Sequence, residues 1–118
     1  MNLARKKARQ MVFAMCCLNP GTTIVWTCHS MDAMRDTMAI FDEISLDLSL
    51  FIEKLSRAHG EERLIFINGS RIYFGARERG FGRGMSPDVL VLDQADVMSE
   101  RTERDMVILG AYGLTIRL

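Results

Sequence analysis

The stretch RGFGRGMSPDVLVLDQAD, residues 79–96, decides the fold class because a glycine-rich arginine loop runs into a short apolar segment that ends on an acid. The segment VLVL, residues 89–92, has no polar member, which is typical of a strand covered on both faces. Open α/β sheets present ligand-facing groups at the carboxyl ends of their strands, so we expect Asp93 at such a rim. An aspartate that caps the next helix explains the same residues equally well.

Outward from this strand, helical and extended patterns alternate along the chain. Residues 2–18 have helical spacing up to the turn Asn19-Pro20-Gly21, and TTIVWTC, residues 22–28, is a β-branched strand pattern. Ser30 is placed to cap a second helix over residues 30–48. The helical pattern continues through SLFIEKLSRAH, residues 49–59, and predicts further helix there.

The second half of the chain predicts a hairpin and then another helix. RLIFING and RIYFGA alternate apolar and polar residues on either side of Asn68-Gly69, a dipeptide favoured in tight hairpins. Residues 97–109 have a helical pattern, and LTIRL, residues 114–118, allows a last short strand. We therefore expect one α/β domain over residues 1–118, with a mostly parallel sheet flanked by helices.

Composition narrows the classes of protein to which the chain can belong. Its 118 residues hold 15 basic and 15 acidic side chains, so any nucleic-acid contact would need a local basic patch. The three cysteines, Cys16, Cys17 and Cys28, lack metal-ligand spacing and indicate reduced thiols, as in a cytosol. MVFAMCCL, residues 11–18, imitates a signal peptide, but the run is short and no cleavage pattern follows it. No segment reaches the ~20 apolar residues of a membrane span.

The pair Asp93-Gln94 suggests a phosphoryl-transfer site in which the water-activating residue is replaced. In P-loop enzymes an aspartate after such a strand holds magnesium, and an adjacent acid activates the attacking water. Gln94 cannot take a proton, and general-base catalysis typically contributes ~10²–10⁴ in rate. Nucleotide binding without hydrolysis would be compatible with this pair.

The loop GFGRG, residues 80–84, is a second candidate site. It lacks the lysine and the Ser or Thr of a phosphate-cradling loop. Arg83 then carries its guanidinium on a flexible glycine-rich backbone, which is suited to contact the phosphate bound by a neighbouring subunit. Arg77 and Arg79 extend a basic patch that could instead contact a DNA backbone. A solvated surface loop is the alternative interpretation.

Together, NGSRIYFGARERGFGRGMSPDVLVLDQADVMSE, residues 68–100, resembles the ATPase domain of the large terminase subunit of tailed bacteriophages, the motor that packs DNA into a procapsid. TIVWTCHSMDAMRDTMAIF, residues 23–41, is similar to a further segment of that family, so the resemblance covers residues 3–109. It implies an incomplete RecA-like P-loop NTPase core, with magnesium and ATP as cofactors. Asp93 matches the family's cofactor- and metal-binding acid, Arg83 its catalytic arginine, and Gln94 departs from its catalytic glutamate.

Two further departures shape the functional expectation. The sequence contains no G-x-x-x-x-G-K-[ST], since none of its lysines, Lys6, Lys7 and Lys54, follows a glycine, and it ends before a nuclease domain. We expect a core that lacks the P-loop strand and so has an unpaired sheet edge. The resemblance then implies a fragment or degenerate relative of the packaging motor, not expected to hydrolyse ATP alone. It would act with other terminase or packaging-motor subunits in a homo- or hetero-oligomer, in the bacterial host cytoplasm. Double-stranded DNA is a further candidate partner.

Two alternatives stay open. The first is a non-enzymatic phage or prophage module that binds terminase subunits or DNA. The second is a piece of a helicase, because Asp93-Gln94-Ala95-Asp96 differs by one residue from the acidic tetrad of DEAD-type helicases. The arginine-glycine loop and two expected helices between the first strand and the hairpin argue against the helicase.

Overall fold

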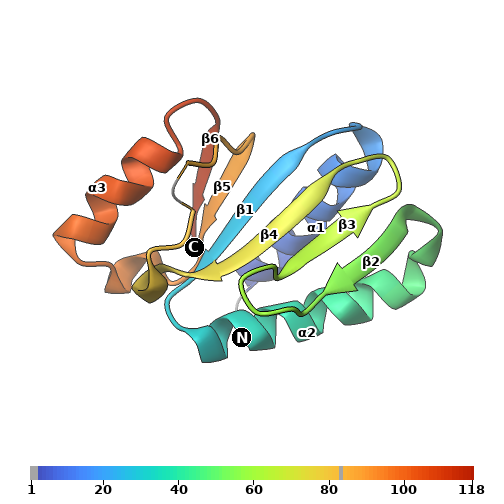
Figure 1. Ribbon diagram of the computed structural model, residues 1–118, viewed down its shortest axis with the longest axis horizontal. Helices are drawn as coiled ribbons and strands as arrows, with labels where there is room; N and C mark the ends of the chain where they lie inside the picture. The colour runs from blue at the N-terminus through green and yellow to red at the C-terminus, as the bar shows by residue number, and fades with distance from the viewer. Residues whose placement is uncertain (1–2, 83) are drawn as a thin grey trace.

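The computed structural model describes residues 3–82 and 84–118. Within this part of the chain, three α-helices and six strands form the fold, and β2 to β5 follow one another without an α-helix between them (Figure 1). Their bounds are α1 Leu3–Leu18, β1 Thr23–Cys28, α2 Met31–Asp47, β2 Ile52–Ser56, β3 Arg63–Phe66, β4 Arg71–Ala76, β5 Val89–Leu92, α3 Glu100–Leu109 and β6 Leu114–Arg117. Short 3₁₀ turns occupy Ser49–Phe51, Arg77–Arg79 and Ala95–Val97. Within the described ranges, no helix is both long and apolar enough to cross a membrane.

The strands form one mixed sheet in the order β2-β3-β4-β1-β5-β6. The neighbours β4, β1, β5 and β6 are mutually parallel, whereas β3 runs antiparallel to both β2 and β4. The expected α/β class with a mostly parallel sheet is therefore confirmed. Because β1 and β5 are internal and parallel, their carboxyl ends meet at one rim of the sheet.

Two hydrophobic layers cover the sheet. On one face α1 and α2 pack against the sheet. The Phe41 ring of α2 contacts Trp26 edge-on and Phe74 at a tilt, at ring-centroid distances of 5.4 and 5.2 Å. On the other face α3 packs through Met106 and Leu109. All four residues of β5 are buried between these layers, as the uninterrupted VLVL run predicted (Figure 1).

Local signals account for several element boundaries. The Ser30 hydroxyl accepts a hydrogen bond from the backbone N–H of Ala33 at 3.2 Å, which confirms the predicted cap of α2. β3 and β4 form the predicted hairpin, and Gly69 occupies the left-handed region with φ of 88°. The last expected strand is present as β6.

The helix expected over residues 49–59 is wrong. After a 3₁₀ turn, Ile52–Ser56 forms β2, which pairs with β3 with a register shift between Ile52 and Lys54. Helix-forming residues such as Leu55 adopt the extended form because the free edge of β3 offers backbone partners and apolar cover. One of the two helices expected between the first strand and the hairpin, an argument against a helicase, is thus a strand.

Candidate functional site

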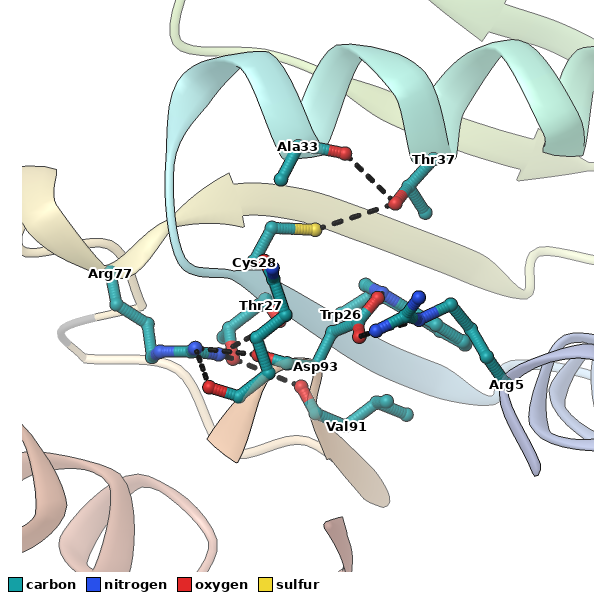
Figure 2. Close-up of polar contacts among 10 residues, drawn as sticks. Arg5, Trp26, Thr27, Cys28, Ala33, Thr37, Arg77, Val91 and Asp93 are labelled. Atoms are coloured by element: carbon teal, nitrogen blue, oxygen red, sulfur yellow. Dashed lines mark hydrogen bonds and ion pairs between the residues drawn. The ribbon is translucent and has the colours of Figure 1, made fainter. Parts of the chain in front are cut away.

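Asp93 directly follows β5, at the rim where the parallel strands end. Its carboxylate is buried, with 5% of the side chain exposed. One carboxylate oxygen, Oδ1, accepts a hydrogen bond from Nε of Arg5 at 2.7 Å and forms an ion pair with Nη2 of Arg5, also at 2.7 Å. The other oxygen accepts a longer bond of 3.3 Å from the indole N–H of Trp26 (Figure 2). The chain's own donors therefore hold the acid that sequence analysis singled out.

The partner of this carboxylate comes from the first turns of α1. Arg5 keeps 32% of its side chain exposed, so the ion pair lies at the boundary between core and solvent. Arg9, one turn further along α1, extends the positive charge. Burial lowers the pKa of Arg9 first, the like charge of Arg5 lowers it further, and Asp93 opposes this shift. The start of α1 thus concentrates basic charge beside Asp93.

A second arginine approaches the same rim from the opposite side (Figure 2). Arg77 follows β4 and donates to the carbonyl and hydroxyl oxygens of Thr27, at 3.0 and 2.9 Å. Its other terminal nitrogen donates to the main-chain carbonyls of Asp93 and Gln94. The Thr27 hydroxyl in turn donates to the Val91 carbonyl at 3.0 Å. Arg77 therefore ties the ends of β4, β1 and β5 together.

Burial decides what Arg77 can do. The residue is 7% exposed, and burial is the main reason that its pKa is lowered, while nearby Cys28 and Asp93 oppose the shift. Arg77 therefore does not add to an exposed basic patch as expected, because its guanidinium donates to buried carbonyl acceptors instead. Contact between this loop and DNA stays a prediction. The side chain of Arg79, the other member of that patch, lies outside the described part of the structure.

Gln94 makes the sharp turn that follows Asp93. Its backbone is left-handed, with φ of 54° and ψ of 49°, the one non-glycine residue with positive φ in the described ranges. This conformation costs roughly 1–2 kcal/mol for a residue with a Cβ, and the Arg77 bond to the Gln94 carbonyl at 3.0 Å helps to hold it. Backbone strain of this kind is common at functional sites, but it assigns no chemistry to the side-chain amide.

Within the described residues, the arrangement shows no complete magnesium site. Magnesium requires several oxygen ligands in octahedral geometry, and both Asp93 oxygens already accept hydrogen bonds. Among the described residues, no group of three or more His, Cys, Asp or Glu side chains could hold a metal. The metal-binding role of Asp93 and the catalytic role of Gln94 stay predictions.

The arginine-glycine loop packs over the opposite face from α1. Phe81 lies against Gly75, where an added Cβ would come within 2.0 Å of the Phe81 ring, and Gly82 likewise leaves no room beside Leu109. Between the loop and α3 is a cavity of about 380 Å³. Arg83 lies outside the described residues, so its predicted contact with a neighbour's phosphate stays a prediction.

Sequence analysis missed Arg5 and misjudged Arg77. The strand-end rule that selected Asp93 also applies to Arg77, which directly follows RIYFGA, so a signal was present. Arg5 is 88 residues from its partner, and no local pattern relates the two.

Comparison with solved structures places this geometry in a known fold. The large terminase of bacteriophage HK97 matches with a TM-score of 0.73 at 15% sequence identity, over 93% of this chain and 25% of that one. The large terminase ATPase domain of Thermus phage P74-26 matches with a TM-score of 0.62 at 15% identity, over 97% of this chain and 53% of that one. No protein-family model and no curated protein sequence matches the chain. Over most of its length, the chain therefore has the fold of the large terminase ATPase domain, as the sequence resemblance implied.

Proposed function

We propose that this chain contributes to viral DNA packaging as one part of a terminase-type motor core, and that it does not hydrolyse ATP on its own. The fold likeness to two large terminases supports the first half. The matched chains are longer, since this chain spans about a quarter of one and about half of the other. In the proposal the chain acts together with other packaging-motor polypeptides in a bacterial host cytoplasm.

The observation that carries the second half is the state of Asp93. It stands at the carboxyl end of an internal parallel strand, where ligands meet such sheets, yet Arg5 and Trp26 occupy both its oxygens. The next residue, Gln94, has no proton-accepting carboxylate. The resemblance implies magnesium and ATP as cofactors. In this proposal their site in the chain is incomplete, because the Asp93 oxygens already accept hydrogen bonds within the chain and position 94 has no carboxylate.

A free sheet edge supports assembly with another polypeptide. β6 ends the strand order, and no other strand of the described chain pairs with its outer side. The Leu114 and Leu118 N–H groups donate to carbonyls of residues 88 and 92, toward β5. The alternating residues Thr115 and Arg117 then direct their main-chain groups outward. Such an edge favours the addition of a strand from a partner.

Nucleotide assays on the purified chain test the enzymatic half. Phosphate release from Mg-ATP should stay at the buffer background, and calorimetry with a non-hydrolysable ATP analogue should give no measurable binding. Gln94→Glu alone should not restore turnover, because it leaves Arg5 on Asp93. Magnesium-dependent turnover by the parent chain that Asp93→Asn abolishes would overturn the proposal.

Deletion of the reading frame in the genome that encodes the chain tests the packaging half. Empty procapsids should accumulate, and the yield of DNA-filled particles should fall. As a control, a strain that keeps the chain and carries only Asp42→Asn, at a half-exposed acid of α2 away from the rim, should yield filled particles normally. An undiminished yield of filled particles after deletion would rule out the packaging role.

The second candidate is a non-enzymatic module that binds terminase subunits or duplex DNA. The exposed Lys6 and Lys7, on a helix that carries no acidic residue, favour an anionic partner. Fluorescence anisotropy with a labelled duplex distinguishes the two. Salt-sensitive binding that is indifferent to Mg-ATP favours the module, and the absence of DNA binding removes its DNA form.

A further inference from the structure

The surface outside the rim holds one more unexplained feature, an apolar groove of about 590 Å³ between α1 and α2. Its lining is apolar along the floor and polar only toward the start of α1. The apolar lining residues are Phe13, Ala14, Cys17 and Leu18 of α1, Ile40 and Ile44 of α2, Leu48 at the C-cap of α2, and Phe51 of the following 3₁₀ turn. None of them contributes to the contacts of Asp93 or Arg77.

Several of these side chains are largely exposed. Leu18 is 78% exposed, and Ile40, Leu48 and Phe51 are 36–41% exposed. A groove lined by several exposed apolar side chains is a feature of protein interfaces rather than of an ordinary soluble surface. Something should therefore cover it.

The two walls of the groove carry opposite charge. On α1, Lys6 and Arg9 line the groove, and the helix has no acidic residue. On α2, the exposed Asp36, Glu43 and Asp47 lie three or four residues from the groove-lining Ile40 and Ile44. This spacing places the acids along the same side of the helix. The α1 wall is thus basic, and the outer rim of the α2 wall, just beside the groove lining, is acidic.

We propose that a second copy of this chain covers the groove, in a two-fold dimer whose axis runs along it. Both α1 and α2 start at the carboxyl rim of the sheet, α1 beside Asp93 and α2 after β1, so they run in the same direction. A two-fold rotation about the groove direction lays each α1 over the α2 of the other copy. The basic wall then meets the acidic wall twice, and the apolar floors close on each other.

Charge complementarity selects this occupant. A self-complementary surface is what a two-fold interface requires, because each contact occurs twice with the roles of the copies exchanged. A uniformly basic or uniformly acidic partner would repel one wall of the groove. The proposal is independent of nucleotide chemistry and goes beyond the proposed function.

Paired charge reversals test the dimer. Lys6→Glu with Gln10→Glu makes the net charge of the basic wall negative, since only Arg9 stays positive there. Glu43→Lys with Asp47→Lys makes the net charge of the acidic rim positive, since only Asp36 stays negative there. All four substituted residues are exposed. Sedimentation equilibrium should show self-association of the parent and at least about tenfold weaker association of each reversed protein. An equimolar mixture of the two reversed proteins should restore it, because both contacts of the mixed dimer then join opposite charges.

The control is Arg104→Glu with Asp105→Lys on α3, where the exposed charges lie on the opposite face of the sheet from the groove. Its association should equal that of the parent. Three results would overturn the proposal: a parent that stays monomeric, dimers indifferent to both reversals, which would point instead to the β6 edge, or a mixture no stronger than its components. Because the mixture must regain association, misfolding of one variant cannot pass for support.

Discussion

The ion pair between Arg5 and Asp93 should stabilise the fold more than the other described ion pairs. Its acid has 5% of the side chain exposed, whereas the acids of the others have 39–93% exposed. Removal of one partner of a buried pair costs about 3–5 kcal/mol. Since Arg5 is 32% exposed, water screens part of this energy. We therefore expect Arg5→Met to lower the free energy of unfolding by about 2–3 kcal/mol.

A double-mutant cycle isolates the pair from other effects of each substitution. Arg5→Met, Asp93→Asn and the double variant should give a coupling energy of about 2 kcal/mol. The single tryptophan, Trp26, is fully buried and donates to Asp93, so its fluorescence follows urea unfolding. The exposed pair of Arg57 and Asp42 serves as the control, with an expected coupling of at most about 0.5 kcal/mol. Equal coupling in the two cycles would refute the reasoning.

Three further predictions concern the packing around this rim. Gly75→Ala should lower the melting temperature because its Cβ would lie 2.0 Å from the Phe81 ring. Phe81→Ala in the same chain should recover part of this loss. If it recovers none, the clash with Phe81 is not the cause of the lower melting temperature. Burial raises the pKa of Cys16 to about 12 and that of Cys28 to about 11, from 9.0. The stability that these neutral thiols contribute is complete below pH 9 and is lost as the pH rises toward those values. The urea midpoint should fall over this interval, less so after alanine replaces both cysteines. Arg77→Lys should lower the free energy of unfolding by about 2–4 kcal/mol, because an ammonium cannot reproduce the guanidinium's spread of buried hydrogen bonds; unchanged urea unfolding would contradict this.

Local sequence predicted those parts of the fold that local chemistry controls. The VLVL run, the Asn68-Gly69 hairpin and the Ser30 cap each depend on residues close in the chain. The strand order depends on contacts between distant segments, such as β1 lying between β4 and β5, and no periodicity shows it. β2 was mistaken for helix for the same reason, since its extended form depends on pairing with β3.

In the candidate site, too, some features follow from local sequence and others depend on contacts between distant segments. The rim position of Asp93 followed from a general rule about strand ends. Its occupancy by Arg5 depends on where α1 packs against the sheet, which is a tertiary property. Arg77 was visible as a strand-end residue, but the glycines and arginines that follow it suggested a solvated loop. A buried arginine is uncommon, because burial requires enough acceptors nearby, and only the folded chain brings together those of Thr27, Asp93 and Gln94.

The Arg5 contact also limits what Asp93 can bind. Any cation that needs this carboxylate must first separate it from the guanidinium, because Arg5 already supplies the positive charge. If that separation costs about 2 kcal/mol, the binding-competent form is a few per cent of the population and the apparent affinity falls about 30-fold. The same coupling energy therefore measures both the stability of the rim and its resistance to a ligand. A partner polypeptide that drew Arg5 away, by offering another acceptor, would free the carboxylate without any change in Asp93 itself.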